Sequence, residues 1–262
     1  MSRHAEVTAL VLAAGQGTRM NSDLPKVLHP VAGTPLLGHV LRTLELLGVG
    51  RTLVVIGHQR ERVRAAFPRV PVRWVTQEPQ RGTGHAVMMA EPELKGFAGT
   101  LLVVCGDTPL LRAATLSQLL EGHAATGAAV TVLSMRLPDP TGYGRVLREG
   151  PIAPGIAARI LGIVEHRDAS AEQRAIDEVN SGIYAFSYPR LAEVLARLTA
   201  HNQQGEYYLT DAVSLMREAG LATSVVCGSD YRELLGINTV EQLAEAERVY
   251  RELPAAGAER RA

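Results

Sequence analysis

A glycine-rich loop followed by two cations is the first part of the chain that could do chemistry. Gly15 and Gly17 come after an apolar run, and two glycines let backbone N–H groups approach an anion closely. Arg19 and Lys26 follow Gly15 within eleven residues, so both can reach the same anion. Arginine offers bidentate contacts to phosphate oxygens, whereas lysine offers a compact point charge. The segment therefore favours a phosphate site, with an ordinary strand-to-loop turn as the alternative.

The loop fits neither of two common phosphate motifs. No Gly-Lys-Ser/Thr closes it, so it is not a Walker A loop, and the dinucleotide fingerprint lacks its third glycine. Lys26 is one of only two lysines in a chain with 27 basic residues, which favours a chemical role over a chance surface position.

Residues that could contact a nucleobase follow a later apolar run. Gln77 offers amide donors and a carbonyl acceptor, a pattern that can read the edge of a base. Gly82 and Thr83 let the backbone approach a flat base or a sugar. Thr83 is also a candidate helix cap, and both roles can hold together. We assign His85 a structural role.

Two further positions could ligate a cation. Asp107 follows an apolar run in the sequence Cys105-Gly106-Asp107, and a carboxylate at the end of a strand is a natural ligand for Mg²⁺. The alternative is a turn-forming aspartate close to Pro109. Asn238 precedes the last predicted helix and could ligate a cation or cap that helix; its position alone favours the cap.

The later part of the chain carries polar residues that could bind sugar hydroxyls. These are Gly144, which offers a close backbone, together with Glu165 and Asn180 near the ends of apolar runs. Ordinary turn and strand-edge polarity is the alternative at each position. No Ser/His/Asp set, HExxH motif or Cys/His cluster stands out, so we expect no protein nucleophile. Transfer between two phosphate-bearing substrates needs none, because positioning and charge neutralisation carry most of the catalysis.

Alternating strands and helices must position these residues. Apolar runs predict strands over 7–14, 52–57, 70–76, 100–105 and 129–135. Helical patterns separate them over 35–47, 59–67, 84–91 and 114–124, with Pro35 as a first helical residue and Gly48 as a stop. This order predicts a Rossmann-like, doubly wound α/β fold with a mostly parallel sheet, whose ligands bind at the carboxyl ends of the strands.

The pattern changes after about residue 138. Strands are expected over 144–148, 160–165, 179–186 and 223–227, and helices over 189–200, 209–219 and 240–253. We predict one compact α/β domain, residues 1–253, with a smaller candidate sugar-binding lobe inserted at about 138–188. A frayed tail is expected over 254–262.

Composition excludes several classes of function. The chain has 262 residues, 46% of them hydrophobic, with 27 basic and 27 acidic side chains. A net charge of zero argues against nucleic acid as a partner. Cysteines at only two distant positions argue against a disulfide scaffold or a zinc ribbon. The first residues do not read as a targeting signal, and no apolar run reaches the roughly 18 residues of a membrane span. We expect a cytoplasmic protein without a membrane partner.

Several motifs together resemble the sugar-nucleotide pyrophosphorylase family. The similarity is strongest to the uridyltransferase halves of bifunctional bacterial enzymes that make UDP-N-acetylglucosamine. It extends from about residue 7 to residue 250. The motifs are LVLAAGQGTRM, LPKVLH, GTGHAV, CGDTPLL, DPTGYGRV, GIVEHRDAS, EVNSGIYAF and QGEYYLTDAV.

The resemblance implies roles for particular residues. Arg19 and Lys26 are the implied catalytic residues, which hold the phosphates of UTP and of a sugar 1-phosphate. Asp107 and Asn238 are the implied Mg²⁺ ligands, which overrides the cap assignment for Asn238. The implied nucleotide-binding residues are Leu12, Ala13, Ala14, Gly15, Lys26, Gln77, Gly82, Thr83, Cys105, Gly106 and Asp107. The implied sugar-binding residues are Gly144, Glu165, Asn180 and Asn238.

The chain also departs from the family pattern. It lacks the hexapeptide repeats of the bifunctional members, so we expect no left-handed β-helix, no acetyl transfer and no trimer contacts from it; the oligomeric state stays open. The segment 149–159 is longer than usual and could alter the sugar pocket. Thr239 stands where a second asparagine is common. The alternatives are a pyrophosphorylase for another base or sugar, such as glucose 1-phosphate, and a non-catalytic sugar-nucleotide sensor.

Overall fold

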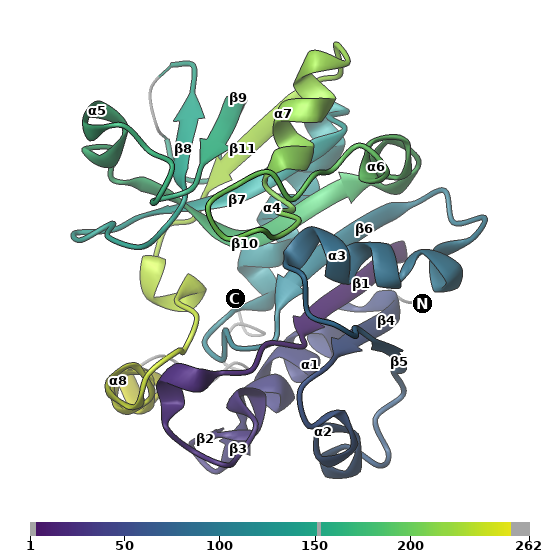
Figure 1. Ribbon diagram of the computed structural model, residues 1–262, viewed down its shortest axis with the longest axis vertical. Coiled ribbons are helices and arrows are strands. Elements are labelled where there is room, and N and C mark those ends of the chain that lie inside the picture. Colours follow the sequence, from purple (N-terminus) through teal and green to yellow (C-terminus); the bar gives the residue numbers. More distant parts are fainter. Residues whose placement is uncertain (1–3, 151–152, 253–262) are drawn as a thin grey trace, which may run out of the picture.

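A mixed sheet, with nine strands among the described residues, forms the centre of the molecule (Figure 1). The computed structural model describes residues 4–150 and 153–252. The order of the strands in the sheet is β5-β4-β1-β6-β10-β7-β11-β9-β8, and β2 and β3 form a separate two-stranded hairpin. The strands are β1 His4–Ala13, β2 Pro30–Val31, β3 Thr34–Pro35, β4 Val49–Ile56, β5 Arg73–Thr76, β6 Thr100–Cys105, β7 Val130–Arg136, β8 Arg145–Arg148, β9 Ala157–Val164, β10 Glu178–Ser187 and β11 Thr223–Cys227.

Helices cover both faces of this sheet, as the α/β prediction requires. Strand β6 shows why, because Leu101 and Val103 point into one hydrophobic cluster and Leu102 and Val104 into the other. The first cluster contains residues of α3, α6 and α7, and the second those of α1, α2 and α4. The α-helices are α1 Leu36–Leu47, α2 Arg60–Ala66, α3 Thr83–Met89, α4 Ala113–Thr126, α5 Ala171–Arg174, α6 Tyr188–Leu195, α7 Asp211–Glu218 and α8 Val240–Glu252. Short 3₁₀ helices are η1 Thr18–Met20, η2 Lys26–Leu28, η3 Glu91–Leu94 and η4 Tyr231–Leu234.

The sheet is parallel in its first half and mixed in its second. Strands β5, β4, β1 and β6 pair in parallel, which brings the loops after β1, β5 and β6 to one edge. Strand β10 then runs antiparallel to both β6 and β7. The strands of the segment 138–188, which we predicted as a smaller lobe, thus join the same sheet, and β10 lies at its centre.

Most predicted elements occur within a few residues of their expected bounds. Gly48 ends helix α1 in a left-handed conformation, as expected. The helix begins at Leu36, so Pro35 is its N-cap and not the first helical residue that we predicted. The hairpin of β2 and β3 was not predicted, and α6 ends at Leu195 rather than near residue 200. No helix in the described ranges is long and apolar enough to cross a membrane.

Two predictions concern segments that lie wholly or partly outside the described residues. The tail 254–262 lies outside the described residues, as do residues 151 and 152 of the longer loop. The described part of that loop runs beside β11, where the Gly155 N–H donates to the Cys227 carbonyl over 3.0 Å. None of its described residues lines either of the two cavities considered next.

Candidate active site

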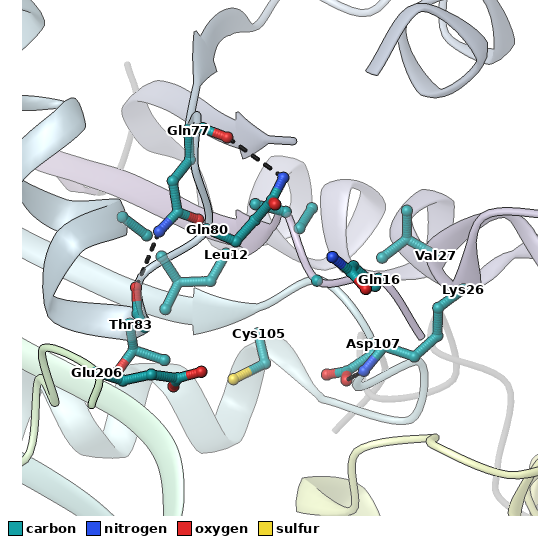
Figure 2. A pocket seen from close by; sticks show the side chains of 15 residues that line it. Leu12, Gln16, Lys26, Val27, Gln77, Gln80, Thr83, Cys105, Asp107 and Glu206 are labelled. Carbon is teal, nitrogen blue, oxygen red and sulfur yellow. Dashed lines mark hydrogen bonds and ion pairs between the residues drawn. The ribbon is translucent and has the colours of Figure 1, made fainter. Parts of the chain in front are cut away.

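Two adjoining cavities open at the edge of the sheet where the parallel strands end. The first has a volume of about 490 Å³ and lies beside the loops after β1 and β5 (Figure 2). The second, of about 340 Å³, lies between the loop before β8, the start of β10 and the segment before α8. Cys105 and Asp107 line both cavities, so the end of β6 is where they meet.

Most of the predicted site residues line one of these cavities. The first cavity contains ten of the implied nucleotide residues: Leu12, Ala13, Ala14, Gly15, Lys26, Gln77, Gly82, Thr83, Cys105 and Asp107. The second contains Arg19 and all four implied sugar residues, Gly144, Glu165, Asn180 and Asn238. Gly106 lines neither; its N–H donates to the Leu12 carbonyl over 2.9 Å and holds the end of β6 against β1.

The glycine-rich loop packs directly against Lys26. Gly17 has a left-handed φ of 66°, and a Cβ at this position would lie 2.5 Å from the Cβ of Lys26. Only glycine fits so close an approach. Arg19, on η1, is exposed, and it makes no ion pair within residues 4–150 and 153–252. Its guanidinium is therefore available to an anion in the second cavity.

Lys26 bridges the two residues that we expected to bind a metal ion. Its ammonium forms an ion pair with Oδ2 of Asp107 and donates a hydrogen bond to Oδ1 of Asn238 over 3.0 Å. The two oxygens thus converge on one positive group, and both are of the type that Mg²⁺ prefers. Asp107 and Asn238 therefore offer suitable oxygen ligands for a divalent ion. Because no group of three His, Cys, Asp or Glu side chains suited to a metal occurs in the described parts, substrate oxygens or water would have to complete its shell.

Thr239, and not Asn238, caps helix α8. The Thr239 hydroxyl accepts from the Gln242 N–H over 3.2 Å, and Gln242 Oε1 accepts from the Thr239 N–H over 3.2 Å. This reciprocal arrangement is a capping box. The preference for Asn238 as the cap, drawn from its position alone, was therefore wrong. Asn238 Nδ2 instead donates to the Gly236 carbonyl over 3.1 Å, which leaves Oδ1 facing Lys26.

An ion pair with a buried carboxylate holds the segment that leads to Asn238. Glu233, on η4, is only 1% exposed and accepts from Arg112 Nε over 2.7 Å and from the Thr115 hydroxyl over 2.5 Å. Both partners belong to the start of α4, directly after the loop that carries Asp107. The contacts fix the two loops of the candidate metal site relative to each other.

Gln77 presents a hydrogen-bond acceptor to the first cavity. Gln77 is 3% exposed, and its Nε2 donates to the Gly82 carbonyl over 2.9 Å (Figure 2). The same nitrogen donates to Nδ1 of His85 over 3.2 Å. Burial and the nearby charge of Arg81 lower the pKa of His85, so its ring is neutral and can accept that bond. With the nitrogen engaged on the protein, the carbonyl oxygen of Gln77 is the group left for a ligand.

Thr83 does not cap helix α3, contrary to one of its two predicted roles. Gly82 occupies the cap position, and no side-chain hydrogen bond caps the helix. The Thr83 hydroxyl accepts from the Leu209 N–H over 3.0 Å instead, which joins the first cavity to the QGEYYLTD segment. Gly82 has φ 95°, and a Cβ there would lie 2.6 Å from the Tyr207 carbonyl.

Glu165 places a half-buried carboxylate in the wall of the second cavity. Burial raises the pKa of Glu165, whose Oε1 accepts from the Thr210 hydroxyl over 3.1 Å. A Cβ on Gly144 would lie 3.3 Å from Oε2 of Glu165, so glycine keeps this side of the cavity open. Among the lining residues, Tyr143, Ser181, Gly182 and Gln242 were not singled out, nor were Gln16, Gln80 and Glu206 in the first cavity. All of these except Gln80 and Gln242 fall within quoted motifs, which was the available signal.

The comparison with known protein families decides the class. Residues 9–206 match the family described as MobA-like NTP transferase domain. The chain belongs to this family. Membership confirms the expected nucleotidyltransferase class, and the match includes the loop of Gly15, the end of β6 and the residues of the second cavity up to Asn180.

Individual relatives are similar over nearly the whole chain. The bifunctional protein GlmU of Thermobifida fusca is 49% identical over 255 residues, which are 95% of this chain and 51% of that protein. GlmU of Streptomyces griseus subsp. griseus is 49% identical over 255 residues, 96% of this chain and 52% of that protein. The chain spans about half the length of these relatives. The resemblance drawn from the motifs is thereby confirmed.

Solved structures share the fold. A UDP-glucose pyrophosphorylase complexed with UDP-glucose superimposes with a TM-score of 0.73 at 19% identity, over 94% of this chain and 98% of that one. A UTP-bound UGPase from Acinetobacter baumannii gives a TM-score of 0.70 at 19% identity, over 96% of each chain. The α/β fold class is confirmed.

Proposed function

We propose that this chain transfers the uridylyl group of UTP to N-acetylglucosamine 1-phosphate, which yields UDP-N-acetylglucosamine and pyrophosphate. The observation that carries the proposal is the pair of adjoining cavities that share Cys105 and Asp107, with Lys26 beside the shared wall. One cavity takes the nucleotide and the other takes the sugar phosphate. Their two phosphates then meet at the end of β6, where the positive charge of Lys26 lies.

The reaction follows from this arrangement. A phosphate oxygen of the sugar 1-phosphate attacks the α-phosphorus of UTP, and a new P–O bond forms as the bond from the α-phosphorus to the bridging oxygen breaks. Pyrophosphate leaves with that electron pair. Lys26 and Arg19 neutralise the negative charge that gathers on the phosphate oxygens. No protein nucleophile is needed, because both substrates bring their own reacting oxygens.

Mg²⁺ is the metal we assign to this site. Asp107 and Asn238 would hold it, since their oxygens already converge on a cationic group. When bound, Mg²⁺ would neutralise charge on the phosphates and favour departure of pyrophosphate. With a cation there, the Lys26 ammonium would no longer pair with Asp107, because two cations cannot share one position. It would then be free to contact the phosphates of the nucleotide.

The base and sugar assignments rest on hydrogen-bond chemistry. The free carbonyl of Gln77 matches the N3–H donor of uracil, whereas cytosine carries an acceptor at that position. Glu165 and Asn180 can bind sugar hydroxyls or the N-acetyl group. The intact set of Arg19, Lys26, Asp107 and Asn238 argues against a silent sensor, which would be free to lose any of them.

The setting of the proposed reaction follows from its substrates. UTP and sugar phosphates are cytoplasmic metabolites, so we place the activity in the cytoplasm. The product is an activated amino sugar, which suits the synthesis of cell-envelope precursors such as those of peptidoglycan. The proposal requires small-molecule substrates and neither nucleic acid nor a membrane.

The test is pyrophosphate release from UTP and Mg²⁺ across a panel of sugar 1-phosphates. We expect N-acetylglucosamine 1-phosphate to support release far better than glucose 1-phosphate. Preference for another sugar would keep the reaction but reject Glu165 and Asn180 as readers of the N-acetyl sugar. Binding of UDP-N-acetylglucosamine without any turnover would favour the sensor.

A further inference from the structure

Strand β10 carries an irregularity at the point where it contributes Asn180 to the second cavity. Its pairing with β7 runs from Asn180 opposite Ser134 directly to Ile183 opposite Leu133, so two residues of β10 have no partner. Gly182, one of the two, has φ 80°, and a Cβ there would lie 2.9 Å from Sγ of Cys105. The Ser181 hydroxyl donates to the Leu133 carbonyl over 2.6 Å and closes the bulge. A bulge of this kind re-aims a side chain.

Both ends of the Asn180 amide are fixed within this bulge. Oδ1 accepts from the Gly182 N–H over 3.0 Å, and Nδ2 donates to the Tyr184 hydroxyl over 2.7 Å. The backbone N–H of Asn180 also donates to the Gly144 carbonyl over 2.9 Å. Because an N–H faces Oδ1, the orientation of the amide is unambiguous. One N–H of Nδ2 and one lone pair of Oδ1 are left over for a ligand.

Tyr184 supplies the anchor that lies outside the bulge. It is 3% exposed, its ring stacks on Phe186 with centroids 5.5 Å apart, and it does not line the second cavity. Burial raises the pKa of Tyr184, so the hydroxyl stays neutral and can accept the bond from Asn180. A hydroxyl on a rigid, buried ring is a fixed point against which the amide of Asn180 is held.

We propose that Tyr184 is a positioning residue for sugar recognition, which acts by holding the Asn180 amide in the orientation that the sugar phosphate meets. The inference rests on the proposed function. Without the hydroxyl, the amide keeps one anchor and can turn about its last side-chain bond. A sugar phosphate that binds must then order the Asn180 amide itself, and the entropic cost of this ordering weakens its binding. The nucleotide cavity, to which Asn180 does not belong, is unaffected.

The experiment compares Tyr184→Phe with Tyr188→Phe in the full chain. Tyr188 is a matched control, because it is 6% exposed on the same part of the chain but packs against Phe97, away from Asn180. Loss of one hydrogen bond predicts that Tyr184→Phe raises KM for N-acetylglucosamine 1-phosphate about fivefold. KM for UTP and kcat should stay within about twofold of wild type. Tyr188→Phe should change none of these constants.

A double variant separates positioning from a general loss of structure. If Tyr184 acts through Asn180, adding Tyr184→Phe to Asn180→Ala should raise KM for the sugar phosphate no further. Equal losses for UTP and the sugar phosphate, additive effects in the double variant, or an unchanged KM in an active Tyr184→Phe would overturn the inference alone. An inactive wild type would overturn the proposed function and this inference with it.

Discussion

The contacts of Lys26 define which kind of cation fits at its position. Its ammonium fits between Oδ2 of Asp107 and Oδ1 of Asn238, and Gly17 lies directly against its side chain. A planar guanidinium is larger and donates in a fixed fork, so it cannot take the same place. We expect Lys26→Arg to lower kcat/KM at least about tenfold, equivalent to about 1.4 kcal/mol of transition-state stabilisation.

Steady-state assays of pyrophosphate release provide the measurement for Lys26→Arg. Lys95→Arg is the matched control, because Lys95 is the second of the two lysines and is exposed directly after η3. Lys95→Arg should behave as wild type. If Lys26→Arg kept the wild-type rate, a point charge at this position would not be required.

Asp107 is predicted to carry the metal dependence of the reaction. Its carboxylate is the charged member of the pair that faces Lys26, so Asp107→Ala should lower kcat about a hundredfold and weaken binding of Mn²⁺ in the presence of UTP. Electron paramagnetic resonance of free Mn²⁺ measures that binding without any turnover. Asp177→Ala, which removes an exposed carboxylate paired with Arg136, is the control and should leave both quantities unchanged.

Removal of the metal tests the same prediction in a second way. A chelator should stop pyrophosphate release by the wild type, and excess Mg²⁺ should restore it. Unchanged turnover of Asp107→Ala with Mg²⁺ would take this carboxylate out of the metal site.

At the scale of elements, the turn that enters α3 depends on one glycine. Gly82 has φ 95°, and any side chain there would press on the backbone carbonyl of Tyr207. We expect Gly82→Ala to lower the free energy of unfolding by about 2 kcal/mol, because a strained backbone costs of the order of 1–3 kcal/mol. KM for UTP should rise as well, since Gly82 also accepts the bond that orients Gln77.

Denaturant unfolding of Gly96→Ala is the control for that prediction. Gly96 has φ 76° but no atom within 4 Å of its would-be Cβ, so it reports the cost of the left-handed backbone alone. Gly82→Ala should be the more destabilised of the two, and only Gly82→Ala should weaken UTP binding. Equal losses of stability with normal UTP kinetics would contradict the role we give to this turn.

The elements differ in how far their sequence could predict them. The buried parts of strands such as β1 and β6 consist almost wholly of apolar residues, and a short apolar run of this kind favours a buried strand. The hairpin of β2 and β3 has two residues in each strand, too few to show any periodicity. The insertion of β10 between β6 and β7 depends on pairing between distant segments, which no local pattern records.

The residues of the candidate site also differ in how far the sequence could predict their roles. The residue types after β1, β5 and β6 pointed to phosphate, base and cation chemistry, because the carboxyl ends of parallel strands share one edge. The two roles of Asn238 could not be separated from its position alone. The capping box of Thr239 and Gln242 decides between them only once the helix start is known. The Tyr184 contact depends on a bulge whose register is a property of the folded sheet.

At the scale of the whole molecule, one buried histidine links stability to pH. His123, on α4, is 7% exposed and within 2.9 Å of the Thr131 hydroxyl, and burial lowers its pKa to about 4. In the unfolded chain the same group titrates near 6.5. Between these values the unfolded state binds more protons, so stability falls as the pH drops from about 6.5 to about 4. The loss attributable to His123 is about 3 kcal/mol at most.

Denaturant unfolding at pH 7.5 and pH 4.5 tests this linkage in the wild type and in His123→Leu. Burial also raises the pKa of Glu165 and of Asp211, and these carboxyl groups act in the opposite direction, so the difference between the two proteins is the quantity to compare. The wild type should lose more stability than His123→Leu on acidification. An identical loss in both would show that His123 is not buried as a neutral ring.

The central claim is that two substrates meet at the end of β6 and exchange a uridylyl group there. The most direct measurement uses UTP labelled at the α-phosphate, Mg²⁺ and N-acetylglucosamine 1-phosphate, and follows the label and pyrophosphate together. We predict that the label appears in UDP-N-acetylglucosamine in equal amounts with pyrophosphate, and that neither product forms when the sugar phosphate is left out. Label in UMP, or release of pyrophosphate without the sugar phosphate, would contradict the account.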